Sequence, residues 1–175
     1  MGELFSIQLQ NRQQQGRDGV WLDLPTTTEQ VQAALRQIGI SSDNPQGLFI
    51  SGYFAEEEKR FAISYNMVLA SNVDELNFLA SRLETLSTGE RAELNAALQA
   101  PQSELFSIGR ITDFPENVDY YVHLPDVHGP AQLGDYYLNR SGMVDMPEEW
   151  KGGIDTAQFG RYVAQQEQGA FTQYG

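Results

Sequence analysis

The chain has 175 residues and no cysteine, and its 24 acidic and 11 basic side chains give a formal net charge of −13. Phosphate backbones would repel such a protein, so direct nucleic-acid binding is disfavoured and a basic partner is the natural complement, although acidity also serves solubility. The absence of cysteine excludes disulfides and thiolate metal sites and fits a cytoplasmic protein, and no stretch approaches the ~18 apolar residues of a membrane span.

The first 65 residues predict a small unit of mixed α/β structure. Apolar and polar residues alternate in "LFSIQLQ" (4–10), which is typical of a half-buried strand, and "VWLDLP" (20–25) predicts a second strand. A third strand is predicted for "GLFISGYF" (47–54), where Gly52 indicates a bulge or a close approach of another group to the backbone.

A helix is predicted between the second and third strands of this unit. Thr26 and Glu29 have the spacing of a capping box, and Gly39 is placed to end the helix. After the third strand, alternation in "RFAISY" (60–65) predicts a further strand that extends the sheet.

Residues 66–100 predict a helical hairpin. Ser71 followed by Asp74, and Ser87 followed by Glu90, have the pattern of two helix starts, and leucine and alanine recur at helical spacing behind each. This central segment is too small to hold a separate core.

Residues 101–175 return to mixed structure and carry eleven acids and four bases. The predicted elements are a short helix within 103–111, a strand over 118–124, a helix from Pro130 to Gly142, one turn after Pro147, a helix capped by Asp155 and a strand over 169–174. The whole sequence therefore predicts an α+β protein, an elongated chain of three small units at 1–65, 66–100 and 101–175.

The third segment contains an acidic run without a single Lys or Arg, from residue 111 to residue 139. Its five carboxylates are Asp113, Glu116, Asp119, Asp126 and Asp135, and it also holds both histidines of the chain. Further acids follow at Asp145, Glu148 and Glu149. The pattern is compatible with a metal or catalytic site, a solvated face or an extended binding surface.

A metal-dependent enzyme is the weaker of these hypotheses. His123, Asp126 and His128 could converge across "HLPDVHG" as two histidines and a carboxylate, but nothing in the spacing requires it. Asp119 and His123 would lie ~13 Å apart along a strand, too far to share an ion. No Gly-rich phosphate loop, nucleophile elbow or Ser/His/Asp spacing is present, so the support for an enzyme is weak and we expect no metal site.

The order of several motifs resembles the antirestriction ArdA family. They are "GVWLDLP", a capped helix, "DELNFLASRLETL", "LGDYYLNRSGMVDMPEEW" and "IDTAQFGRY", and the resemblance extends from about Phe5 to Tyr174. The C-terminal motifs are the most specific. The resemblance implies a small, three-domain, dimeric protein of mobile elements that has no catalytic residues or cofactor. Such a protein imitates bent duplex DNA and blocks the methyltransferase core of type I restriction–modification enzymes.

The resemblance makes the acidic residues of the C-terminal third the candidate DNA-mimic surface, because Lys59 and Arg60 counter the acids at 56–58. The candidates are Asp113, Glu116, Asp119, Asp126, Asp135, Asp145, Glu148 and Glu149. A unit of 75 residues with this many aromatic side chains also predicts a two-fold homodimer through residues 101–175. The candidate dimer contacts are Tyr136, Tyr137, Phe171 and Tyr174. A non-catalytic interaction protein that kept the fold without inhibition is the alternative.

Overall fold

The computed structural model describes residues 3–14, 18–41 and 45–175, and its architecture is mixed α+β, as the sequence predicts. The chain forms two compact units. The first comprises residues 1–91 and 104–118, and the second comprises residues 92–103 and 119–175. The division into segments at 1–65, 66–100 and 101–175 stays a prediction.

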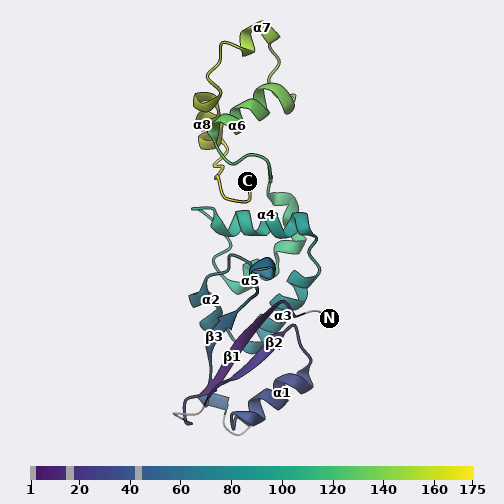
Figure 1. The fold of residues 1–175 in the computed structure, drawn as a ribbon, viewed down its shortest axis with the longest axis vertical. Coiled ribbons are helices and arrows are strands. Elements are labelled where there is room, and N and C mark those ends of the chain that lie inside the picture. Colours follow the sequence, from purple (N-terminus) through teal and green to yellow (C-terminus); the bar gives the residue numbers. More distant parts are fainter. Residues whose placement is uncertain (1–2, 15–17, 42–44) are drawn as a thin grey trace. The chain divides into compact units, whose positions relative to one another are not determined.

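The first unit contains a three-stranded antiparallel sheet (Figure 1). The central strand β1 (Phe5–Asn11) pairs with β2 (Val20–Leu24) on one side and with β3 (Leu48–Phe54) on the other. Phe5, Ile7 and Leu9 are buried on one face, so the alternating pattern of the sequence is the pattern of the core. All three strands predicted within 4–54 are therefore confirmed.

Gly52 is a point of close approach, and the bulge lies next to it at Ser51. Gln8 pairs with Gly52 and Leu9 pairs with Ile50, so the intervening residue of β3 is the extra residue of a bulge. A Cβ atom on Gly52 would lie 3.0 Å from Cη2 of Trp21 and 3.1 Å from Cβ of Gln8. The indole of β2 thus lies over the backbone of β3 across the central strand.

Helix α1 (Thr28–Gln37) begins one residue later than predicted. Thr27 is the N-cap and forms a capping box with Gln30, whereas the sequence spacing indicated Thr26 and Glu29. Both pairs have suitable side chains, and the extended backbone of Thr27 decides between them. Gly39 follows the helix with φ of 70°, as expected for a residue that ends a helix.

The strand predicted over residues 60–65 is wrong. The chain has no regular structure from residue 60 to 64, and Tyr65 begins helix α2 (Tyr65–Leu69). Phe61 and Ile63 are nevertheless buried. Alternation indicated the burial of Phe61 and Ile63 correctly, but Tyr65 is 48% exposed and the segment is not part of the described sheet.

Three further helices follow: α3 (Val73–Glu84), α4 (Thr88–Gln99) and α5 (Ile108–Thr112). The cap of α3 is Asn72, one residue after the predicted Ser71, whereas the predicted box of Ser87 and Glu90 does open α4. The apolar face of α3 is fully buried, and α3 packs against α5 within the first unit; the face consists of Leu76, Leu79, Ala80 and Leu83. Short 3₁₀ turns occupy Pro45–Gly47, Glu57–Lys59, Phe114–Glu116 and Val118–Tyr120.

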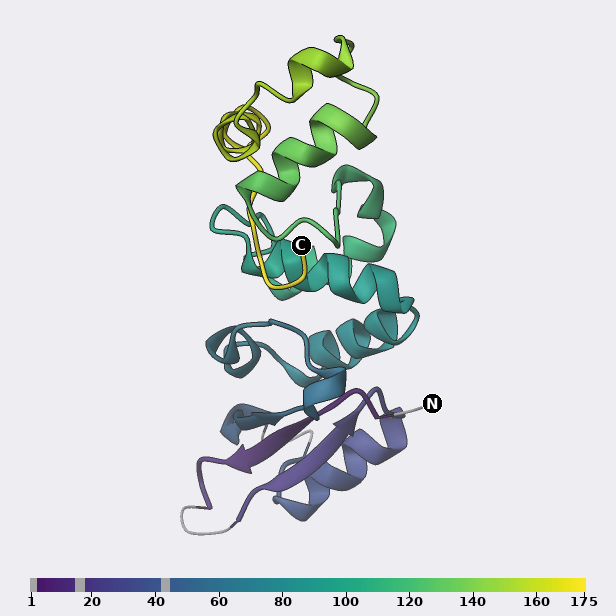
Figure 2. The same ribbon diagram turned by 45° about the horizontal axis from the view of Figure 1, so that its top comes forward.

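The second unit is built on the crossing of α6 (Pro130–Asp135) and α8 (Thr156–Gln166), visible in green and yellow in Figure 2. Helix α6 continues as a π-helical turn over Tyr136–Arg140, and α7 (Glu148–Lys151) is a single turn. The side chain of Asp155 accepts a hydrogen bond of 2.9 Å from the amide of Gln158, which confirms the predicted cap of α8. A cluster of buried residues, Val127, Leu133 and Val163, forms the core.

Two strands predicted for this part of the chain are also wrong. Residues 118–120 form a 3₁₀ turn, and residues 121–124 and 169–174 have no regular structure. Tyr120 and Val122 are 84% and 87% exposed, so the alternating apolar positions do not form a buried face. Within the described ranges, every strand belongs to the first unit. None of the helices described is long and apolar enough to cross a membrane.

Candidate DNA-mimic surface

Almost all of the candidate carboxylates are exposed. Asp113 and Glu116 belong to the first unit, and the other six belong to the second. Seven of the eight are exposed residues, and Asp135 is half-buried. The eight carboxylates lie at helix ends and in turns and loops, where a charged side chain can remain hydrated.

In the first unit, the end of α5 positions both acids. Asp113 is the C-cap of α5 and immediately precedes the 3₁₀ turn that contains Glu116. Phe114 lies between them and is almost completely buried. The buried ring anchors the turn, so the two flanking carboxylates are held at its surface.

In the second unit, turns and short helices present the acids. Asp119 lies in a 3₁₀ turn, and Asp126 lies in a turn closed by a 3.0 Å hydrogen bond from the Val127 amide to the carbonyl of Leu124. Glu148 and Glu149 form the first turn of α7, next to the helix N-terminus, where negative charge is favoured.

Three of these carboxylates form ion pairs with bases of the same chain. Glu116 lies 2.7 Å from Arg82, Asp135 lies 3.5 Å from Arg140, and Glu148 lies 2.6 Å from Lys151. The acidic run has no base of its own, so all three partners come from outside it. Sequence reasoning missed these pairs, although the spacing of three residues between Glu148 and Lys151 on one helix was a usable signal.

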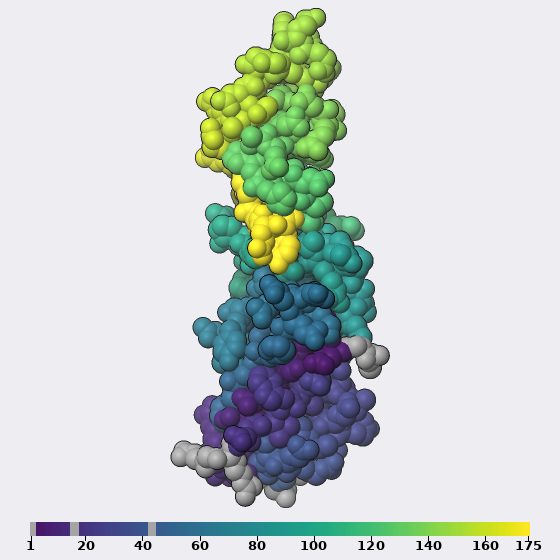
Figure 3. All heavy atoms as spheres, in the orientation of Figure 1, coloured from purple at the N-terminus to yellow at the C-terminus, as the bar shows by residue number. Residues whose placement is uncertain are grey.

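The two histidines hold the end of the chain in place. Nε2 of His123 lies 2.7 Å from the carbonyl oxygen of Tyr174, and Nδ1 of His128 lies 3.4 Å from that of Thr172. The final residues, bright yellow in Figure 3, accordingly lie on the surface of the second unit. Over the ranges that the structure describes, no three His, Asp or Glu side chains are grouped to hold a metal ion, and His123, Asp126 and His128 are not such a group.

The aromatic residues expected at a dimer contact have partners within the chain. Tyr136, Tyr137 and Phe171 pack against the core cluster of the second unit. The hydroxyl of Tyr137 donates a 2.8 Å hydrogen bond to Glu167. Desolvation, and to a smaller extent this hydrogen bond, raises the pKa of Tyr137 to about 12. Tyr174 contributes its backbone carbonyl to His123.

Other apolar side chains of the second unit face the solvent. The exposed set consists of Tyr120, Val122, Met143, Trp150 and Tyr162. Sequence periodicity did not distinguish these residues from the buried aromatic ones, because both kinds occur in the same short helices and loops.

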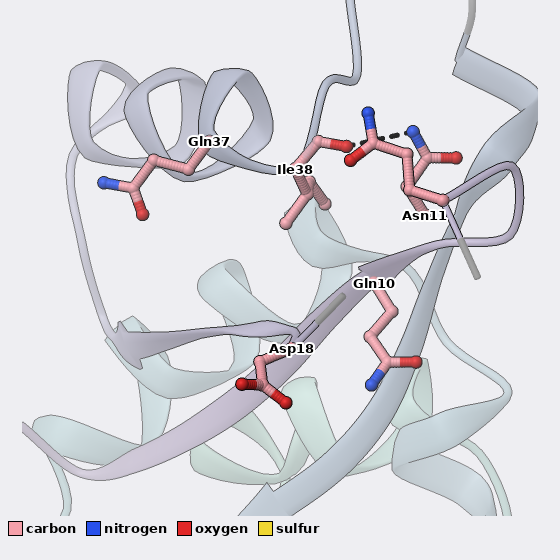
Figure 4. A pocket seen from close by; sticks show the side chains of 6 residues that line it. Gln10, Asn11, Asp18, Gln37 and Ile38 are labelled. Atoms are coloured by element: carbon pink, nitrogen blue, oxygen red, sulfur yellow. Dashed lines mark hydrogen bonds between the residues drawn. The ribbon is translucent and has the colours of Figure 1, made fainter. Parts of the chain in front are cut away.

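The hollows of the first unit are small. One, of about 20 Å³, lies between the end of β1 and the end of α1, where Nδ2 of Asn11 donates a 2.9 Å hydrogen bond to the carbonyl of Ile38 (Figure 4). Its volume is that of about one water molecule. A wider depression of about 260 Å³ is lined by Tyr53, Arg60, Phe61 and Tyr65 among others, and it contains no carboxylate.

Comparison with known proteins identifies the family. The family model described as "Antirestriction protein (ArdA)" matches residues 15–175, which is nearly the whole chain. A comparison with curated proteins finds no match. The family is one of inhibitors rather than catalysts, and it implies an interaction with type I restriction enzymes. The chain therefore belongs to the ArdA family of antirestriction proteins.

Proposed function

We propose that this protein inhibits a type I restriction–modification enzyme by occupying the DNA-binding channel of its methyltransferase core. The candidate carboxylates take the place of phosphates. The observation that carries the proposal is the exposure of these acids in a chain of net charge −13 that belongs to an antirestriction family.

The physical basis is the same as that of DNA binding. Duplex DNA carries one negative charge per ~1.7 Å of its axis, and a protein that binds it exposes Lys and Arg along the contact. Carboxylates spread over turns and helix ends would meet the same bases, and added salt would screen this attraction as it does for DNA. No base-edge recognition is needed, because phosphate contacts position a protein without reading sequence.

The expected energetics are additive. An exposed ion pair contributes about 0–1 kcal/mol, so no single carboxylate can dominate the affinity. Single Asp→Asn changes should therefore be nearly silent, whereas four or more together should weaken inhibition steeply. An enzyme would behave in the opposite way, because loss of one catalytic carboxylate abolishes its activity.

The test is competition between this protein and duplex DNA for a type I methyltransferase complex, across a series of salt concentrations. The variant replaces five acids by their amides: Asp113, Asp119, Asp126, Asp145 and Glu149. The matched control neutralises five acids elsewhere: Glu56, Glu57, Glu58, Asp74 and Glu75. We expect a large loss of competition for the variant, a small one for the control, and weaker binding at higher salt. Equal losses, or affinity indifferent to salt, would refute the proposal.

We also propose a homodimer formed through residues 101–175. Trp150, Tyr162 and the rest of the exposed apolar set support an interface in the second unit. Sedimentation at micromolar concentration should give a dimer, and Trp150→Ser with Tyr162→Ser should shift it towards monomer. A wild-type chain that sediments only as a monomer would contradict this proposal.

The same exposed side chains favour one alternative function. A protein that kept the fold but lost inhibition would use this surface for another protein partner. It would fail to compete with DNA for any type I methyltransferase complex, and that outcome separates it from the main proposal.

A further inference from the structure

Three candidate carboxylates, Glu116, Asp135 and Glu148, are each paired with a base of the same chain. The side chain of Arg82 is 30% exposed and that of Glu116 is 71% exposed. Lys151 is 15% exposed beside Glu148 at 81%, and Arg140 and Asp135 are each about half exposed. In two of the pairs, therefore, the acid faces the solvent while the base lies against the protein.

Packing keeps these bases in place. The guanidinium of Arg140 lies 5.6 Å from the ring centre of Tyr136, which is cation–π distance. Nη2 of Arg82 donates a 2.7 Å hydrogen bond to Glu116, and Nζ of Lys151 donates one of 2.6 Å to Glu148. A base whose aliphatic chain packs against the protein and whose charge is paired stays beside the acid when a partner approaches.

A carboxylate with a fixed base a few ångströms away acts on a distant charge as a dipole. Its field falls off faster than that of a lone charge, and beyond a Debye length of ~8–10 Å it is screened further. Such an acid attracts the bases of a partner less strongly than an acid without a base beside it.

We infer that Arg82, Arg140 and Lys151 attenuate the DNA-mimic surface, so that Glu116, Asp135 and Glu148 contribute less than their full charge. This inference rests on the proposed function and adds a set of residues that limits it. The three bases set how strongly, and at which salt concentrations, the protein competes with DNA. Replacing these three bases by neutral side chains should therefore produce a stronger inhibitor.

The experiment uses the full-length chain with Arg82→Gln, Arg140→Gln and Lys151→Met, singly and together. Methionine retains the apolar stem that packs Lys151. Binding to a type I methyltransferase complex is measured by competition with duplex DNA at several salt concentrations. We expect a gain of at most about fivefold per base removed at low salt, and a clearly larger gain when all three bases are removed together. The affinity should also fall more steeply with salt, because salt screens the added net negative charge.

Two controls separate local pairing from global charge and from folding defects. Lys59→Gln removes a base paired at 2.9 Å with Glu56, which is outside the candidate set, and should change affinity little. Adding Glu116→Gln to Arg82→Gln should cancel the gain, whereas Glu116→Gln in the wild-type chain leaves Arg82 unpaired and should weaken binding by a similar factor. Thermal unfolding followed by circular dichroism identifies any variant that fails to fold. Arg140 is the most exposed of the three bases, so Arg140→Gln should fold and can be tested even if the other variants do not.

The outcomes distinguish the two levels of the argument. If the wild-type protein does not compete with DNA, the proposed function itself fails. If it competes but folded variants show no gain and no steeper salt dependence, the inference fails while the proposed function stands. An equal gain for Lys59→Gln would also overturn it, because net charge alone would then explain the effect.

Discussion

Replacing Gly160 by alanine should destabilise the second unit, because α6 and α8 cross there with no space for a side chain. A Cβ atom at Gly160 would lie 2.7 Å from the carbonyl carbon of Pro130 and 2.8 Å from the amide nitrogen of Gly134, and closer still to the Pro130 oxygen. All of these are backbone atoms, so no neighbouring side chain can rotate away. The helices would have to separate until these contacts approach the ~3.5 Å of normal packing.

The magnitude follows from two opposed effects. Overpacking of a core costs about 1–3 kcal/mol, and the upper value applies because backbone must move. Alanine is favoured over glycine in a helix interior by about 1 kcal/mol. The net loss is therefore about 2 kcal/mol, which corresponds to a fall in Tm on the order of 10 °C for a unit of this size.

Hydrogen exchange and thermal unfolding followed by circular dichroism test this expectation. Amides of 130–140 and 156–166 should lose protection, while those of β1 should not. Gly109→Ala is the matched control, since a Cβ there has no neighbour within 4 Å, and it should be neutral or slightly stabilising. Unchanged Tm and unchanged protection in Gly160→Ala would refute the reasoning.

Three further outcomes are expected. Asp155→Ala should cost about 1 kcal/mol of unfolding free energy in denaturant titration, because the first turn of α8 loses its cap; a loss below ~0.3 kcal/mol would contradict that role. Tyr53→Phe should not destabilise the protein, because the Tyr53 hydroxyl is buried without a partner among the described residues and burial raises its pKa; a loss above ~1 kcal/mol would reveal an unrecognised bond. Tyr137 should ionise near pH 12 in an ultraviolet titration. Because its pKa in the folded protein lies above the ordinary value of 10, the stability that this group contributes is complete below pH 10 and is lost as the pH rises towards 12. Tyr137→Phe should not show this loss.

Local signals predicted most of the helices, although α2 was not predicted and α5 begins at Ile108, later than the start predicted for it. The caps at Ser87 and Asp155 were predicted correctly, and the caps of α1 and α3 were displaced by one residue. Neighbouring residues in both places have similar capping side chains, so composition cannot choose between them. Helix ends are determined within a few residues of sequence, which explains why they can be predicted.

Strands were predicted correctly only where a partner strand exists. The alternation in 4–10 and in 60–65 is similar, but in the described part of the chain β1 pairs with two strands whereas residues 60–65 are not part of the sheet. The ion pairs of the candidate surface could not be predicted either, where the paired residues are far apart in the sequence. The exposure of the acids follows from their type, whereas the pairing of Glu116 with Arg82, 34 residues away, depends on how α3 and α5 pack.

The π-helical turn after α6 has an electrostatic consequence. The Ser141 amide bonds to the Tyr136 carbonyl at 2.8 Å, five residues back. In an α-helix, residues five apart point in directions about 140° different, so Asp135 and Arg140 would face away from each other. The wider winding brings them to the same side. Deleting one residue between Asp135 and Arg140 would restore α-helical winding and leave the two charges four residues apart, a spacing at which side chains of an α-helix also meet. The wider turn therefore accommodates an extra residue in the helix without breaking this ion pair.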